Sequence, residues 1–129
     1  MIFVSFYSNH KFLNNLDKFT YFKISVGFPK NFNENLRIPR EQLIEYPKLF
    51  LSKQLVLDYK ANKISQEEYT KIYIENVLNK LNVHDTYNEL ISLSIPKNPV
   101  LLCYEKTGFC HRNLVMKWFL NNRYICQKF

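Results

Sequence analysis

Glycine is scarce in this chain, and its cysteines do not form an even set. Among 129 residues only Gly27 and Gly108 are glycines, which excludes the glycine-rich phosphate loops GxxxxGK[ST] and GxGxxG. The three cysteines, Cys103, Cys110 and Cys126, are confined to the C-terminal part, unlike the disulfide framework of a small secreted domain. We therefore predict no cofactor and expect a reduced, cytoplasmic setting.

Long hydrophobic runs are also missing. No apolar stretch reaches the length of about 18 residues that a membrane span requires. Residues 2–7 are apolar, but no basic region precedes them and polar residues follow, which favours a strand over a signal peptide. We expect a soluble protein with no membrane partner.

Acidic residues are the scarcer charged class. Eighteen Lys and Arg against eleven Asp and Glu give a net charge of +7, with +4 in residues 1–60 and +4 in residues 101–129. This distribution favours anionic partners, either nucleotides or nucleic acid. Because like charges do not occur in blocks, a diffuse solubilising surface is the competing interpretation.

The hydrophobic content of 47% is typical of a globular chain, and the length suits a single domain, residues 1–129. Residues 100–104 are apolar on both of the faces that alternate along a strand. This pattern predicts a central strand covered on both faces. Ser65 and Glu68 form a capping-box pattern at the start of an amphipathic helix. The expected strands are 2–7, 21–26, 100–104 and 123–127, and the expected helices are a short one between Pro39 and Pro47, then 48–59, 65–81, 85–93 (capped by Asp85) and 111–121. This order predicts a small three-layer α/β/α sandwich around a mostly parallel sheet.

Residues 103–112 concentrate the groups that can carry chemistry. Cys103 ends the predicted central strand, Glu105 follows it, and Cys110, His111 and Arg112 begin the next helix. Open α/β sheets bind ligands at the carboxyl ends of their strands. The unpaired amides of a helix start attract anions, and an arginine adds a bidentate donor. The pattern therefore predicts a site for a small anionic ligand.

Each residue of this site has a functional and a structural interpretation. Arg112 is the predicted anion anchor, Glu105 and His111 the proton-transfer groups, and Cys110 a nucleophile or polar contact. Glu105 has the alternative of simply pairing with a neighbouring cation, and His111 that of packing or capping locally. Cys103 is either part of the ligand site or an inert buried residue.

Tyr7 and Ser25 lie at the ends of two predicted strands and are expected to line the same crevice, unless they are ordinary strand termini. Cys103, Cys110 and His111 supply three possible zinc ligands. However, the paired spacing of zinc motifs is absent, and adjacent ligands such as Cys110 and His111 rarely converge. We therefore predict no metal site.

Residues 99–106, Pro-Val-Leu-Leu-Cys-Tyr-Glu-Lys, and the following Cys110-His111-Arg112 resemble the uncharacterised domain-of-unknown-function family 488. Weaker similarity extends to residues 24–30 and 64–69. The residues between Lys106 and Cys110 differ, because members commonly carry a longer acidic or proline-containing stretch there. The resemblance implies a three-layer α/β fold and a shared site, but no established reaction.

Two functions follow from these patterns. The first is an α/β domain that binds a nucleotide or nucleoside-like anion at residues 103–112 and acts on it if the site is catalytic. The alternative is a nucleic-acid-binding or host-interaction protein that uses its basic surface, with the cysteine turn serving as a structural latch. The oligomeric state does not follow from the sequence.

Overall fold

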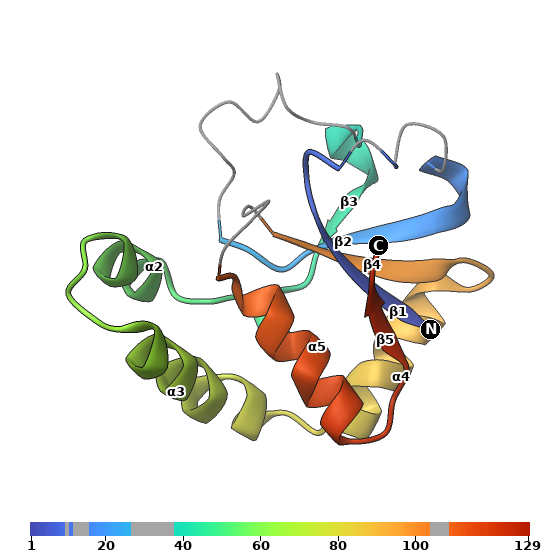
Figure 1. Cartoon of the computed structure of the whole chain (residues 1–129). Helices are drawn as coiled ribbons and strands as arrows, with labels where there is room; N and C mark the ends of the chain where they lie inside the picture. Colours follow the sequence, from blue (N-terminus) through green and yellow to red (C-terminus); the bar gives the residue numbers. More distant parts are fainter. Residues whose placement is uncertain (10, 12–15, 27–37, 104–108) are drawn as a thin grey trace.

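A computed structural model describes residues 1–9, 11, 16–26, 38–103 and 109–129 (Figure 1). The strands in these ranges form one sheet in the order β3-β2-β4-β1-β5, and all neighbouring strands are parallel. Their bounds are β1 (Ile2–Phe6), β2 (Phe19–Lys23), β3 (Leu43–Glu45), β4 (Asn98–Cys103) and β5 (Cys126–Lys128). The predicted parallel α/β fold is confirmed, with β4 in the centre.

The described ranges contain four α-helices, and three of them, α2, α3 and α4, begin after a residue whose side chain accepts a capping hydrogen bond. The helices are α2 (Lys53–Lys60), α3 (Gln66–Asn76), α4 (Val83–Ser94) and α5 (His111–Asn121). At α3 the predicted capping box is present: Glu68 N donates to Ser65 Oγ at 3.1 Å, and Ser65 N donates to the Glu68 carboxylate at 3.4 Å. At α4 the prediction was wrong, because Asn82 rather than Asp85 is the cap and accepts from Asp85 N at 3.0 Å.

Several element bounds differ from those predicted. The helix expected over 65–81 ends at Asn76 and is followed by the 3-10 turn η5 (Leu78–Lys80). The short helix expected after Pro39 is one 3-10 turn, η3 (Arg40–Gln42), which leads directly into β3. The 48–59 helix is divided into the turn η4 (Pro47–Leu49) and α2. A strand or turn of three residues is too short to show a periodic pattern. The position of β3 is decided by its pairing with β2, and the positions of the 3-10 turns by packing.

The two faces of β4 contribute to two different hydrophobic clusters, as its alternation predicts. Leu101 and Cys103 belong to a helix-side core, which also contains side chains of all four α-helices, for example Tyr73, Leu90 and Phe119. Figure 1 shows α2, α3 and α5 gathered on one side of the sheet. The opposite-face core consists of Tyr7, Tyr21, Ile38, Val100 and Leu102, with Phe3, Phe19, Leu43 and Phe129 packed against it. No α-helical residue of the described ranges belongs to this second cluster.

Among the described helices, none has the length and apolar character needed to cross a membrane.

Candidate functional site

The parallel register brings the ends of three strands to one edge of the sheet. Phe6 at the end of β1 pairs with Cys103 at the end of β4, and Lys23 at the end of β2 pairs with Leu102. Tyr7 N then donates to the Cys103 carbonyl at 3.4 Å. Helix α5 is the next described element after β4 and begins at His111, so its first turn lies near the same edge of the sheet. The predicted site residues of the described ranges therefore all come from this carboxyl edge, whereas Glu105 lies outside those ranges.

His111 is held in one orientation by a backbone carbonyl. Its Nε2 lies 2.7 Å from the Ile24 carbonyl oxygen, which can only accept, so Nε2 carries the proton and Nδ1 keeps its lone pair. The ring packs edge-on against Tyr73, with centroids 5.3 Å apart. Burial lowers the pKa of His111 to about 4, and the nearby Arg112 charge also lowers it, against the opposing effect of the Ile24 hydrogen bond. The imidazole is thus neutral at physiological pH.

Arg112 is buried in the first turn of α5, with only 7% of its surface exposed. Its Nη1 donates to Cys103 Sγ at 3.3 Å, and its guanidinium lies over the Phe6 ring at 5.8 Å from the centroid. The cation therefore contacts the last residues of both β4 and β1. The guanidinium therefore places a buried positive charge at the edge where the strands end.

Cys103 and Cys110 are joined by a disulfide, and both are buried, with 1% and 4% of their surfaces exposed. The sequence predicted neither this bond nor the burial of Cys110. Of the two interpretations of Cys103, that of a buried core residue agrees with its position in the helix-side core. In the disulfide form Cys110 has no thiol that can act as a nucleophile.

Counting thiols tests this bond. The remaining cysteine, Cys126, is buried and free, and burial raises the pKa of its thiol to about 12. Because the thiolate is the form that attacks the disulfide of the reagent, we expect the native chain to react slowly with Ellman's reagent. The unfolded, unreduced chain should then show one thiol, and the unfolded, reduced chain all three. Three thiols without reduction would contradict the disulfide.

Tyr7 and Ser25 do meet, but on the other face of the sheet. The Tyr7 hydroxyl and Ser25 Oγ are 2.9 Å apart, and this buried pair joins the ends of β1 and β2 across β4. Tyr7 belongs to the opposite-face core, whereas Cys103 and Cys110 belong to the helix-side core. The sequence predicted one crevice lined by all of these residues. The structure instead has two adjoining groups of polar side chains at one edge of the sheet, one on each face.

Lys23 is a buried cation that the predicted site did not include. It is 2% exposed, its Nζ lies 3.3 Å from Glu45 Oε1, and it stands over the Phe50 ring at 5.1 Å from the centroid. The sequence did contain a signal for its burial: strand alternation places Lys23 on the same face as Tyr21 and Ser25. A second buried cation thus lies at the end of β2.

The three possible metal ligands converge more closely than their spacing suggested. The sulfurs of Cys103 and Cys110 and a ring nitrogen of His111 all lie within 4.8 Å of one another. The expectation that adjacent residues would point apart was wrong. It failed because Cys110 precedes the helix in an extended conformation, whereas His111 is its first helical residue.

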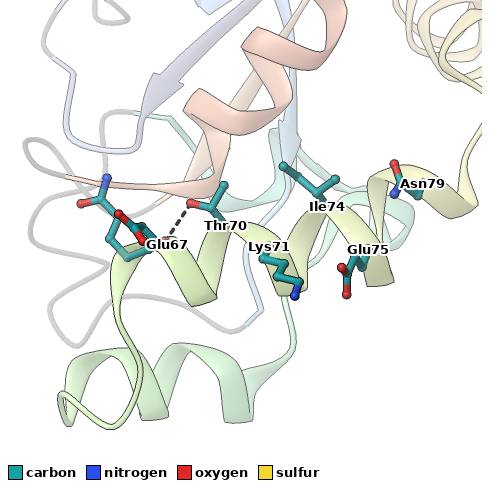
Figure 2. Close-up of a pocket in the computed structure, with 7 residues that line it drawn as sticks. Glu67, Thr70, Lys71, Ile74, Glu75 and Asn79 are labelled. Carbon is teal, nitrogen blue, oxygen red and sulfur yellow. Dashed lines mark hydrogen bonds between the residues drawn. The ribbon is translucent and has the colours of Figure 1, made fainter.

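One groove among the described residues is formed by α3 and the turn η5 that follows it. It runs along the outer side of α3, has a volume of about 510 Å³, and is lined by Gln66, Glu67, Thr70, Lys71, Ile74, Glu75 and Asn79 (Figure 2). Thr70 Oγ1 within it donates to the Gln66 carbonyl at 2.8 Å, an ordinary contact within a helix. None of the predicted site residues lines this groove.

Comparison of the chain with family models, with curated proteins and with solved structures finds no match, so the resemblance to family 488 stays a prediction carried by its own residues.

Proposed function

We propose that this chain binds a small anionic ligand, of nucleotide or nucleoside-like class, at the carboxyl edge of its sheet. The observation that carries the proposal is the buried guanidinium of Arg112, which lies at the start of α5 against the last residues of β1 and β4. The proposal concerns binding; in the disulfide form neither Cys103 nor Cys110 is available for covalent chemistry.

The topology of the sheet supports this location. β1 and β4 are neighbours in the sheet. The chain runs from β1 to β2 in one direction along the sheet, and from β4 to β5 in the opposite direction. Ligands of open α/β sheets bind outside the carboxyl ends of strands at such a reversal. Arg112 lies at this point.

The electrostatics of the same place favour a negatively charged group. The effective dielectric constant around a buried guanidinium is lower than around an exposed guanidinium, so its attraction for an anion is stronger. A guanidinium can also bind phosphate or carboxylate through two parallel hydrogen bonds. The first amides of α5, an eleven-residue helix, add the positive end of its dipole. Lys23 is a second buried cation at the same edge, paired with Glu45 and, by strand alternation, on the opposite face of the sheet.

A thermal-shift screen of nucleotides, nucleosides and inorganic phosphate tests the proposal. A ligand that binds only the native state stabilises it by about 2.7 kcal/mol at a concentration one hundred times its Kd. We expect a nucleotide to raise the Tm of the parent chain. We expect Arg112→Ala to weaken its binding at least about 10-fold, because a hydrogen bond to a charged group contributes about 1.5–3 kcal/mol.

The matched control is Lys117→Ala, which removes one positive charge from the exposed side of the same helix. It should leave binding nearly unchanged, and Arg112→Lys should bind with intermediate affinity because it keeps the charge without the bidentate donor. Equal losses in Lys117→Ala and Arg112→Ala, or no Tm shift with any of these anions, would refute the proposal. Oligonucleotide binding that falls steeply with salt and survives Arg112→Ala would favour the nucleic-acid alternative.

A further inference from the structure

The sulfur and nitrogen atoms beside Arg112 are arranged like the ligands of a soft metal ion. Cys110 Sγ and His111 Nδ1 are 3.8 Å apart. Zinc–sulfur and zinc–nitrogen bonds of about 2.3 and 2.0 Å place a sulfur and a nitrogen ligand of a tetrahedral ion about 3.5 Å apart. These two atoms are therefore already close to the separation that a shared ion requires.

Cys103 is placed to supply the third ligand. Its Cα lies 7.4 Å from that of Cys110. Two sulfurs bound to one ion are farther apart than two bonded sulfurs, and this Cα separation exceeds the usual 4.4–6.8 Å or so of a disulfide. Reduction of the disulfide therefore leaves two sulfurs that both lie within 4.8 Å of a ring nitrogen of His111.

The hydrogen bonds around the three ligands are those that a metal site needs. The Ile24 carbonyl accepts from Nε2 of His111 at 2.7 Å and so leaves Nδ1 free to coordinate. A ligand histidine characteristically donates its other nitrogen in this way. Arg112 Nη1, at 3.3 Å from Cys103 Sγ, provides a charged donor that stabilises a thiolate.

We propose that, in the reduced chain, Cys103, Cys110 and His111 bind one zinc ion. Two thiolates and one imidazole form a soft donor set that selects zinc over magnesium, calcium or manganese. Three protein ligands leave a fourth position open to water or another ligand, as in catalytic zinc sites. The inference does not depend on nucleotide binding, because it concerns the helix-side residues alone and its measurements contain no nucleotide.

The site is controlled by oxidation, since the same two sulfurs form the disulfide. A phosphine reductant supplies two electrons and becomes the phosphine oxide with oxygen from water, and the disulfide becomes two thiols. Zinc then replaces the two thiol protons, which are released to solvent, and His111 coordinates through its lone pair. A small-molecule disulfide accepts two electrons from the thiolates and leaves as two thiols, so that the Cys103–Cys110 disulfide forms again, two ligands are lost and the ion is expelled.

Titration of the whole chain with Zn²⁺ or Co²⁺ tests the proposal. The chain is reduced with a phosphine, freed of metal with a chelator and handled without oxygen. We expect one ion per reduced chain, and a sulfur-to-cobalt charge-transfer absorption when Co²⁺ is used. The same chain with its disulfide intact should bind neither ion.

Matched variants identify the ligands. We expect Cys103→Ser to lower zinc affinity by at least about 100-fold, since loss of an outer-shell partner alone costs about 10–100-fold. Cys126→Ser and His84→Gln alter a cysteine and a histidine outside the cluster and should bind like the parent. If a variant does not fold, as judged by circular dichroism, the cobalt spectrum of the parent decides. A spectrum without sulfur charge transfer, equal binding by the oxidised chain, or full affinity in a folded Cys103→Ser variant would overturn the proposal.

Discussion

The oxidised, metal-free chain is expected to lose about 3 kcal/mol of its free energy of unfolding between pH 6.5 and pH 4 because of His111. Burial lowers the pKa of His111 from 6.5 to about 4 in the folded chain, whereas the unfolded chain keeps the ordinary value. Between these values the unfolded state binds more protons than the native state. The stability is therefore fully present above pH 6.5, falls as the pH is lowered, and levels off below pH 4.

Urea unfolding at a series of pH values measures this loss in the parent and in His111→Gln. Glutamine has an amide that can still donate to the Ile24 carbonyl, but it does not titrate. The pH dependence of the variant over this range should be smaller by about the contribution of His111. His84→Gln, at an exposed histidine, serves as the control and should follow the parent curve. Identical pH curves for the parent and His111→Gln would show that His111 is not buried as a neutral group.

Replacement of Phe119 by alanine is expected to lower the free energy of unfolding by about 3–5 kcal/mol, through lost burial and the cavity left behind. Phe119 is completely buried in the helix-side core, and its ring packs edge-on against Tyr87 of α4, with centroids 5.4 Å apart. The substitution thus removes a contact that joins the last two helices. Denaturant unfolding measures the change.

Leu120 is the neighbouring residue on the same helix and is 48% exposed, so Leu120→Ala is the matched control. It removes a large apolar side chain without opening a cavity in the core and should cost less than about 1 kcal/mol. Similar losses in the two variants would mean that α5 presents a different face to the sheet than the one described.

Periodicity predicted those elements whose burial repeats over many residues. Helix α5 begins at His111 and ends at Asn121, as the spacing of Leu114, Val115 and Phe119 indicates, and α3 begins after its capping box at Ser65. β4 is central because its apolar residues face both clusters. By contrast, β3 and the end of α3 depend on pairing and packing partners that lie elsewhere in the chain.

For the candidate site, the sequence alone determined which chemical groups stand together in the chain: two thiols, an imidazole and a guanidinium at a strand-to-helix turn. Only the tertiary structure decided that the two thiols are bonded and buried, that Ile24 orients His111, and that Tyr7 and Ser25 meet on the other face. The reason is geometric. Neighbours along the chain share a location by covalent connection, but hydrogen-bond partners from different strands are chosen by the register of the sheet, which no local pattern encodes.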